Sequence, residues 1–440
     1  MAEEPGRIAG LSTRTLSGWG RYPVLPCATV EPDTAAQAAA PPAPVIARGN
    51  GRSYGDSSLG PGGTLLTRRL DHILAFDPAT GVLTCEAGTL LADIFHLFVP
   101  RGWLAPVTPG TKWVTVGGMI AADVHGKNHH GAGSFGEHVH WLDLALGDGR
   151  VLRCSRTEHP DLFAATCGGM GLTGVILAAS FAMMPIPSAW IAQTVERAPD
   201  LDRALAIFDA AQHWTYSVAW VDCLASGGDL GRSVVFLGEH AEGPAQLPAR
   251  RVRRLPFDLP QAALNRYSIS AFNALYYRRQ REGAGRVDLD TYFYPLDALL
   301  DWNRMYGRRG FTQYQCVLPL EASRAGLSAL LQLAAREGNA SFLAVLKRLG
   351  RESFGLLSFP MEGYTLTLDF PVNAATLRLL DRFDEIVAAH GGRLYLAKDA
   401  RMGAPMLQSG YKRLDEFRAV RRRYGVEQRF RSAQSDRLGL

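Results

Sequence analysis

Five polar side chains crowd into six positions of the chain: His125, Lys127, Asn128, His129 and His130. Imidazole groups and buried amines exchange protons near neutral pH, so this cluster suits acid–base chemistry or contact with an anionic ligand. A solvated surface loop is one alternative and a metal site is another. The metal site is disfavoured, because no carboxylate or cysteine recurs at ligand spacing and Lys127 would repel a cation.

Three glycine-rich passages lie within the first 176 residues, at 48–56 (RGNGRSYGD), 115–122 (TVGGMIAA) and 168–174 (GGMGLTG). Glycine lets backbone N–H groups approach an anion or a flat ring closely. The spacing matches neither the dinucleotide-binding GxGxxG pattern nor a phosphate-binding P-loop, and one such passage alone is most often a tight turn. Together the three passages favour one extended dinucleotide cofactor that lies across several loops, with its redox half left open.

Short predicted elements position these passages in the first part of the chain. A strand at 45–47 leads into the first passage, a helix is predicted at 90–99 from its apolar spacing, and a hairpin at 141–151 turns at 147–149. After Pro187 the glycine-rich passages stop and longer elements alternate. The helices predicted there are 201–212, 322–336 and 374–390, and the strands are 217–223, 233–237, 313–318 and 366–370.

Arginines gather at three places in the second half of the chain. Clusters at 250–254 and 278–281 flank a proline-containing, aromatic region that we expect to be a mobile loop. A basic helix is predicted at 411–424 and is typical of a solvated face, with attraction to anionic lipid headgroups as the alternative. The arginines of this helix are Arg418, Arg421, Arg422 and Arg423.

Composition excludes several classes of protein. Of the 440 residues 47% are hydrophobic and 20% are charged, which is typical of a globular chain and excludes a disordered one. The net charge of +5 is mild for a chain of this length, so no nucleic-acid partner is expected. Six scattered cysteines indicate a reducing compartment, and Glu3 and Glu4 stand where a secretory leader needs positive charge. Prolines interrupt the most apolar stretch, 174–192, so a membrane span is not expected.

Lysine is scarce in this chain: of 47 basic residues only five are lysines, a ratio that codon bias explains. A lysine that persists in such a chain is nevertheless a candidate for a position that arginine cannot fill. The five are Lys112, Lys127, Lys347, Lys398 and Lys412.

Four motifs are similar to one group of flavoenzymes: RGNGRSYGD, PGTKWVTVGGMIAADVHGKNHHGAGSFGEHV, TCGGMGLTGVI and GGRLYLAKDAR. They resemble the FAD-dependent oxidases of the vanillyl-alcohol oxidase type and, within these, the decaprenylphosphoryl-β-D-ribose 2′-oxidase family. The resemblance runs from about residue 40 to the C-terminus, and HGKNHH and AKDAR are specific to this subfamily.

The resemblance implies an α+β, two-domain fold. Residues 1–187 would form an FAD-binding domain of the PCMH type, and residues 188–390 an inserted substrate-binding domain built on an antiparallel sheet. The segment 391–440 would return to the FAD domain.

FAD is the implied cofactor, and no metal is implied. The flavin would be non-covalent, because relatives that tether it carry a histidine where this chain has Arg52. The implied FAD-binding residues are Arg48, Gly49, Asn50, Gly51, Arg52, Ser53, Tyr54, Gly55, Gly110, Thr115, Val116, Gly117, Gly118, Ala122, Asp123, His125, Ile176 and Tyr395.

Lys398 and His125 are implied as catalytic residues, and which of them is the base stays open. The implied substrate-binding residues are Lys127, Trp220, Gln315, Lys347 and Thr367. Actinobacterial members carry a cysteine at the position of Thr367, so an altered pocket shape and ligand sensitivity are expected. The C-terminal QRFRSAQSDRL also differs from the family's ending. Together the two differences leave the lipid and the sugar of the substrate open.

The implied activity is oxidation of the ribose C2 hydroxyl of a polyprenyl-phosphoryl-β-D-ribose to the 2-keto sugar, the first half of an epimerisation to an arabinose donor. A separate NAD(P)H-dependent short-chain reductase would complete it. The expected location is cytoplasmic, with peripheral contact at the inner membrane face left open. A soluble sugar, alditol or aldonolactone oxidase of the same superfamily is the alternative, and a non-catalytic protein that keeps the fold is a third hypothesis.

Overall fold

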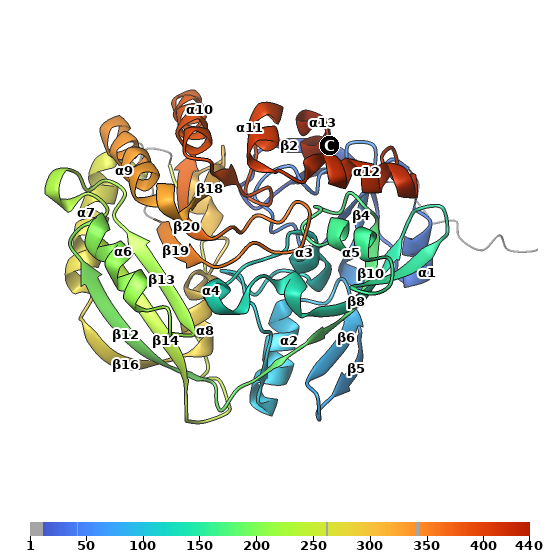
Figure 1. Cartoon of the computed structure of the whole chain (residues 1–440), viewed down its shortest axis with the longest axis horizontal. Helices are drawn as coiled ribbons and strands as arrows, with labels where there is room; N and C mark the ends of the chain where they lie inside the picture. The colour runs from blue at the N-terminus through green and yellow to red at the C-terminus, as the bar shows by residue number, and fades with distance from the viewer. Residues whose placement is uncertain (1–11, 42, 261–262, 339–342) are drawn as a thin grey trace, which may run out of the picture.

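The computed structural model describes residues 12–41, 43–260, 263–338 and 343–440, so Glu3 and Glu4 lie outside the described residues. Sheets of four, five and eight strands organise this part of the chain (Figure 1). The four-stranded and five-stranded sheets come from residues 12–182, the part of the chain that contains the glycine-rich passages. The largest sheet comes from the residues that follow them.

The four-stranded sheet has the order β1-β2-β4-β3. Its strands are β1 (Ser12–Ser17), β2 (Val24–Val30), β3 (Ile46–Arg48) and β4 (Thr64–Leu66), and α1 (Ala35–Ala39) joins β2 to β3. Because β3 and β4 are parallel neighbours, the chain must cross over between them. The first glycine-rich passage forms the start of that crossover.

The five-stranded sheet is antiparallel, with the order β5-β6-β10-β8-β9. Its strands are β5 (Ile73–Asp77), β6 (Val82–Glu86), β8 (Val139–Ala145), β9 (Val151–Ser155) and β10 (Val175–Ala182). The predicted hairpin is confirmed as β8 and β9. The predicted helix at 90–99 is confirmed as α2 (Leu91–Phe98), which buries its apolar face. A two-residue pair, β7 (Trp103–Leu104) with β11 (Met184–Pro185), lies beside them.

The second glycine-rich passage contains a short helix, α3 (Val116–Ala121), where the sequence predicted only a loop. Thr115 caps this helix, since its side chain accepts a hydrogen bond from the backbone N–H of Gly118. Two further short helices follow, α4 (His129–Ala132) and α5 (Pro160–Thr166).

The eight-stranded sheet has the order β16-β12-β14-β13-β19-β20-β18-β21 and is antiparallel throughout. Its strands are β12 (Trp190–Ala198), β13 (Tyr216–Val221), β14 (Ser233–Ala241), β16 (Gly283–Asp288), β18 (Phe311–Pro319), β19 (Ala344–Leu349), β20 (Gly363–Pro371) and β21 (Arg393–Leu394).

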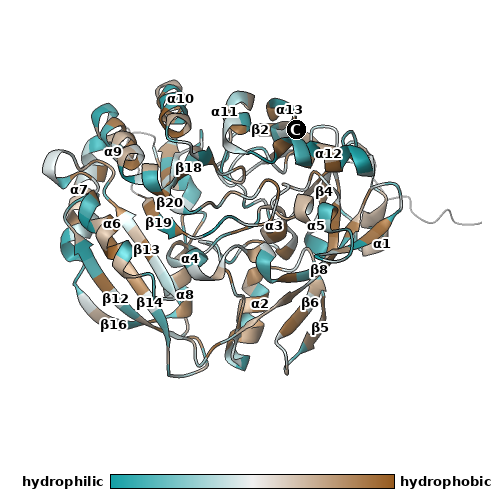
Figure 2. Cartoon of the chain, viewed as in Figure 1, coloured by the Kyte–Doolittle hydropathy of each residue, from teal (hydrophilic) through white to brown (hydrophobic). Residues whose placement is uncertain are grey.

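Three helices pack against the large sheet: α6 (Leu201–Ala210), α9 (Leu320–Glu337) and α10 (Ala374–Ala389). The helices α9 and α10 each have a hydrophilic and a hydrophobic side (Figure 2). Side chains alternate between the two faces of a strand, so Tyr314 of β18 packs on Phe383 of α10 while Gln313 and Gln315 face the other way, into a cavity. The large sheet thereby has one face for helices and one for the candidate site.

A helix, α7 (Arg266–Arg279), occupies much of the region that the sequence predicted as a mobile loop. Asn265 accepts hydrogen bonds from the N–H groups of Tyr267 and Ser268, and the Ser268 side chain accepts one from the N–H of Asn265. This capping box starts the helix despite the prolines before it. Beside it in the sequence are β15 (Arg253–Arg254), which pairs with β17 (Leu299–Leu300), and α8 (Leu289–Phe293).

The C-terminal segment joins the large sheet to the N-terminal part of the chain. It starts as β21 beside β18 and continues as α11 (Ala404–Gly410), α12 (Leu414–Tyr424) and α13 (Ala433–Leu438). A parallel bridge joins Phe430 to Val45, and the backbone N–H of Ala433 donates to the carbonyl of Leu59. The segment therefore ends against the first glycine-rich passage.

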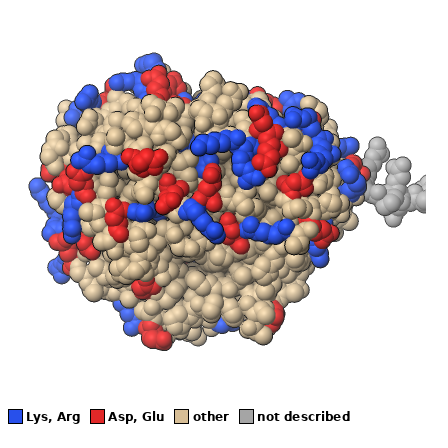
Figure 3. All heavy atoms as spheres, viewed as in Figure 1, with Lys and Arg blue, Asp and Glu red and all other residues tan. Residues whose placement is uncertain are grey.

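Charges of both signs are interspersed over the upper half of the face that Figure 3 shows, and few lie over its lower part. Arg421, which the sequence placed on a solvated basic helix, is instead buried and donates to three backbone carbonyls. Among the described residues, no helix combines the length and the apolar character that a membrane crossing requires.

Candidate active site

A cavity of about 610 Å³ is lined by all three glycine-rich passages and by strands of the large sheet. Ligand sites typically enclose about 300–1,000 Å³. Most of the residues that the resemblance implied for binding or catalysis line this cavity. They are Gly49, Asn50, Gly51, Arg52, Ser53, Tyr54, Gly110, Thr115, Gly117, Gly118, Ala122, His125, Lys127, Ile176, Trp220, Gln315, Lys347, Thr367, Tyr395 and Lys398.

Four of the implied FAD residues do not line the cavity: Arg48, Gly55, Val116 and Asp123. Arg48 donates to the carbonyl of Ser17 and to the Ser58 hydroxyl. Val116 belongs to the apolar core, and the fully buried Asp123 carboxylate accepts from the N–H of Gly136 at 2.9 Å. A Cβ on Gly55 would overlap the backbone of the AKDAR motif. These four residues therefore build the wall behind the cavity.

The first glycine-rich passage offers backbone donors to a ligand. Residues 50–53 all line the cavity, and within the described part of the chain no hydrogen bond uses their N–H groups. Gly51 has a φ of +62°, which an L-residue rarely adopts. A row of unused N–H groups attracts an anion such as a pyrophosphate. The passage therefore fits the diphosphate of FAD.

The expectation of a non-covalent flavin depends on Arg52, which lines the cavity. Its guanidinium carbon lies 4.0 Å from the centroid of a Trp19 ring, a cation–π contact. Burial lowers its pKa, which nearby Asp297 partly opposes. The sequence analysis missed Trp19, because nothing in its N-terminal surroundings links it to the glycine-rich passages.

His125 is buried and surrounded by polar and aromatic groups. Its Nε2 lies 2.9 Å from the amide nitrogen of Gln315, and its ring lies 5.2 Å from that of Tyr395 and 5.3 Å from that of Phe359, between centroids. Burial above all, and then the charge of Lys347, lowers the pKa of His125 well below its usual range. Burial therefore favours the neutral form of the imidazole.

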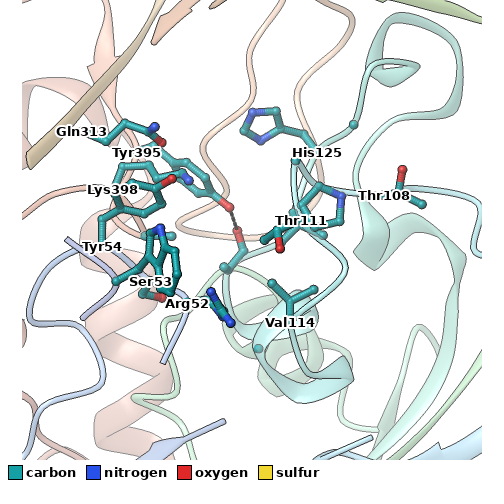
Figure 4. A pocket seen from close by; sticks show the side chains of 18 of the residues that line it. Arg52, Ser53, Tyr54, Thr108, Thr111, Val114, His125, Gln313, Tyr395 and Lys398 are labelled. Atoms are coloured by element: carbon teal, nitrogen blue, oxygen red, sulfur yellow. Dashed lines mark hydrogen bonds between the residues drawn. The ribbon is translucent and has the colours of Figure 1, made fainter. Parts of the chain in front are cut away.

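Lys398 points into the same cavity and lies beside Tyr54 (Figure 4). Its ammonium nitrogen is 3.8 Å from the Tyr54 ring centroid. Burial lowers the pKa of Lys398, the carboxylate of Asp369 raises it, and Lys347 lowers it further. Desolvation exceeds the attraction to Asp369, so the neutral amine is far more accessible than in an exposed lysine.

Asp369 lies opposite Gln313 in the register of β20 and β18. The Gln313 amide donates to its carboxylate at 2.6 Å, and burial raises the pKa of this carboxyl group. The sequence analysis named neither residue. The strand periodicity could have indicated both. Gln313 lies two positions from Gln315, and Asp369 lies two positions from Thr367, so each pair shares one face of its strand.

Two more lysines reach the cavity from different elements. Lys127 donates to the backbone carbonyl of Tyr292 and lies 4.3 Å from the centroid of that residue's ring. Burial lowers the pKa of Lys127 to about 7, with a contribution from Lys347. Burial alone lowers the pKa of Lys347, on β19, to about 8. The cavity thus gathers three lysines whose protons are held weakly.

The members of the histidine cluster, the alternative metal site, have separate hydrogen-bond partners. His129 is buried with its Nδ1 accepting from the N–H of Gly350, and the His130 ring contacts the carbonyl of Trp214. Within the described residues, no group of three His, Cys, Asp or Glu side chains could hold a metal ion.

Comparison with known proteins places this chain in a family. Residues 32–155 match the family model described as an FAD binding domain. The chain is 36% identical to the decaprenylphosphoryl-beta-D-ribose oxidase of Mycolicibacterium smegmatis over 98% of each protein. It is 38% identical to an uncharacterized protein in the mprA 5′ region of Streptomyces coelicolor, over 80% of this chain and 100% of that one.

A more distant similarity covers less of the chain. Cytokinin dehydrogenase 5 of Oryza sativa subsp. japonica is 28% identical over 40% of this chain and 36% of its own length. The near full-length match to the decaprenylphosphoryl-beta-D-ribose oxidase is the match that assigns this chain to a family. The chain therefore has the α+β FAD-binding fold, uses FAD as its cofactor, and is an oxidoreductase of the decaprenylphosphoryl-β-D-ribose oxidase family.

Proposed function

We propose that this protein oxidises the C2 hydroxyl of a polyprenyl-phosphoryl-β-D-ribose to the 2-keto sugar, the first half of an epimerisation to an arabinose donor. The observation that carries the proposal is the convergence of Lys127, Lys347 and Lys398 on the cavity that the FAD-binding passages line. A phosphorylated sugar alcohol needs positive charge for its phosphate and a base for its hydroxyl, and buried lysines supply both. The relative that is 36% identical is named for the same chemistry.

The proposed division of labour follows the chain. Residues 1–187, with the returning segment 391–440, bind FAD, and residues 188–390 bind the sugar and its phosphate. The cavity supports this division, because the glycine-rich passages line one side and the large sheet contributes Trp220, Gln315 and Thr367. The sugar would then lie between the cofactor and the polar face of β18 and β20.

Lys398 is the base in this proposal. Its lowered pKa makes a neutral amine accessible, and that amine takes the proton of the C2 hydroxyl. Bound FAD supplies the acceptor for the hydride that leaves C2. As the C–H and O–H bonds break, the C=O bond forms, and the Asp369 carboxylate offsets the positive charge that Lys398 acquires.

His125 has a binding role in this proposal. Its lowered pKa makes it a poor proton acceptor near neutral pH. Because its Nε2 accepts from the Gln315 amide, the ring proton is on Nδ1, and among the described residues this Nδ1 has no hydrogen-bond partner. His125 can therefore donate that hydrogen bond to a ligand.

Lys127 and Lys347 are the proposed phosphate contacts. Their lowered pKa values reflect a cost of holding charge in an apolar setting, and the single negative charge of a phosphodiester would offset that cost. Gln315, Trp220 and Thr367 line the space beside them and would contact the sugar and the start of the lipid. We assign the completing step to a separate NAD(P)H-dependent short-chain reductase, and the location to the cytoplasm.

A non-covalent flavin is part of the proposal. Arg52 stands against Trp19 and cannot form the bond that a histidine forms in tethered relatives. Acid precipitation should release all flavin into the supernatant. Flavin that remains in the protein pellet after washing would contradict this assignment.

A labelled substrate tests the activity itself. Purified holoenzyme is mixed with farnesyl-phosphoryl-β-D-ribose that carries deuterium at C2, together with an electron-accepting dye. We expect a 2-keto product that has lost the deuterium, formed more slowly than from unlabelled substrate. Turnover of free alditols or aldonolactones with oxygen, without reaction of the prenyl-phosphoryl sugar, would favour the soluble oxidase instead. A colourless purified protein would favour a non-catalytic role.

A further inference from the structure

The helix α7 carries an apolar face outward. Tyr267 is 84% exposed, Leu275 50% and Phe272 45%. Of the residues of α7, only Ile269 and Asn273 are buried. The spacing of Tyr267 and Leu275, eight residues apart, places them on the same side of the helix. Single exposed apolar side chains are ordinary, but a group of large ones marks an interaction surface.

Exposed apolar side chains are concentrated in this part of the chain. Among the described residues ten large hydrophobic side chains are exposed, and five of them lie between 252 and 275. Besides those of α7 they are Val252 and Phe257. Because half of these side chains lie in one short segment, their exposure is not the scattered kind that is ordinary on protein surfaces.

Basic side chains follow the apolar face directly. Arg278, Arg279 and Arg281 are exposed at the C-terminal end of α7, and no ion pair joins any of them to another described residue. In α12, by contrast, Arg418 pairs with Asp415 and Arg423 pairs with Asp161. The two helices lie at opposite ends of the molecule (Figure 1). The arginines beside the apolar face of α7 are therefore freer to contact an anionic surface than Arg418 and Arg423 of the C-terminal helix α12.

An aromatic row connects this face to the cavity. The rings of Trp220 and Tyr276, which both line the cavity, have centroids 4.6 Å apart. The ring of Tyr276 in turn stacks on that of Phe272 at 5.9 Å. Because Phe272 is half-exposed, the row runs from the proposed sugar site to the outer face of α7. An unsaturated hydrocarbon chain can pack against the rings of this row.

We propose that the outer face of α7 docks on a lipid bilayer with anionic headgroups, and that the row Trp220–Tyr276–Phe272 carries the isoprenoid tail between the bilayer and the cavity. Aromatic and leucine side chains enter the boundary between headgroups and acyl chains, while arginines contact the phosphates. The inference rests on the proposed lipid-linked substrate. To that proposed function it adds a membrane-docking surface on α7 and a path for the isoprenoid tail.

Vesicle flotation tests the docking surface. Holoenzyme is floated with vesicles of phosphatidylcholine containing phosphatidylglycerol, and with phosphatidylcholine alone. The test variants are Tyr267→Ser with Leu275→Ser, and Arg278→Glu with Arg279→Glu. The matched control is Leu74→Ser, since Leu74 is 54% exposed on β5 in the other part of the chain. We expect flotation of the wild type and the control with anionic vesicles, and at least about a tenfold weaker binding of both double variants.

Two substrates separate this inference from the proposed function. Oxidation of a short, water-soluble geranyl-phosphoryl ribose should be equal in all variants, whereas oxidation of a long-chain substrate in vesicles should fall with flotation. Flotation of the double variants like the wild type would overturn the docking surface. A wild-type dimer that Tyr267→Ser with Leu275→Ser dissociates would overturn it too, in favour of a protein partner. Failure to oxidise either substrate, with flotation as expected, would instead overturn the proposed function.

Discussion

In the proposed mechanism Lys398 is the base, and its proton affinity depends on two buried neighbours of opposite charge. Asp369 raises its pKa and Lys347 lowers it, both against the larger lowering by burial. Neither neighbour needs to touch the sugar hydroxyl to influence the reaction. Substituting each one should therefore move the pH dependence of catalysis in opposite directions.

Asp369→Asn should shift the pH profile toward acid. Removing the carboxylate lowers the pKa of Lys398, and the neutral amine that acts as base is then present at lower pH. Because the rate rises as pH increases through this pKa, its midpoint moves to lower pH. The pH dependence of single-turnover flavin reduction measures the midpoint, and an unchanged or alkaline-shifted midpoint would exclude this role of Asp369.

Lys347→Met should shift the same profile the other way. Removing a positive neighbour raises the pKa of Lys398, so the midpoint of the rate moves to higher pH. Substrate affinity should fall as well, because Lys347 is a proposed phosphate contact. Saturating substrate separates the two effects, and an acid shift of the midpoint would refute the electrostatic explanation.

Lys398→Ala should remove the base and leave the cofactor bound. Loss of general-base catalysis costs about 100-fold or more in rate. Lys412→Ala is the matched control, because Lys412 is exposed and does not line the cavity. Flavin content and flavin reduction are measured on the same samples. A Lys398→Ala variant that reduces its flavin at the wild-type rate would show that Lys398 is not the base.

At the scale of elements, the first glycine-rich passage lies directly against the start of α3. A Cβ added to Gly49 would overlap the hydroxyl of Thr115, the residue that caps α3. Both elements contribute residues to the cavity, on the side proposed to bind FAD. Their close approach therefore requires glycine at this position.

Gly49→Ala should weaken FAD binding by separating these two elements. Gly131→Ala is the control, since a Cβ on Gly131 meets nothing within 4 Å. Flavin fluorescence during dilution measures the dissociation constant, which we expect to rise at least about tenfold, the equivalent of ~1.4 kcal/mol. Equal FAD affinity in the two variants would show that the passage and α3 do not need this contact.

Sequence patterns predicted a helix or a hairpin correctly where apolar spacing or turn residues alone determine the element. The apolar spacing of α2 and the turn between β8 and β9 needed no tertiary information. The helix α7 was missed, because its capping box begins inside a proline- and arginine-rich stretch and only two of its residues, Ile269 and Asn273, are buried. Asp369 and Trp19 were missed for another reason, since only the folded chain brings them to the cavity.

At the scale of the whole molecule, Arg437 ties the C-terminus to the candidate site. Its guanidinium lies 2.8 Å from the Asp56 carboxylate and 2.9 Å from that of Asp399. Asp56 is the last residue of the first glycine-rich passage, and Asp399 follows Lys398. Both carboxylates are buried, so the ion pairs are shielded from water. One side chain thereby connects three segments that are distant in sequence.

Arg437→Ala should destabilise the protein strongly. It leaves two buried carboxylates without their cation, which costs about 3–5 kcal/mol. Arg413→Ala is the comparison, because its pair with Glu416 is exposed and worth about 0.2–1 kcal/mol. Urea unfolding of the FAD-loaded protein, followed by flavin release and tryptophan fluorescence, measures both. Similar midpoints for the two variants would contradict this role of the C-terminal segment.

The most direct test of the proposed activity is anaerobic mixing of the FAD-loaded protein with excess polyprenyl-phosphoryl-β-D-ribose. Without oxygen or another acceptor, each active site can oxidise one sugar only. We expect the absorbance of oxidised flavin to disappear, with one 2-keto sugar formed for each FAD. An unchanged flavin spectrum in protein that retains FAD and binds the sugar would contradict the assigned activity.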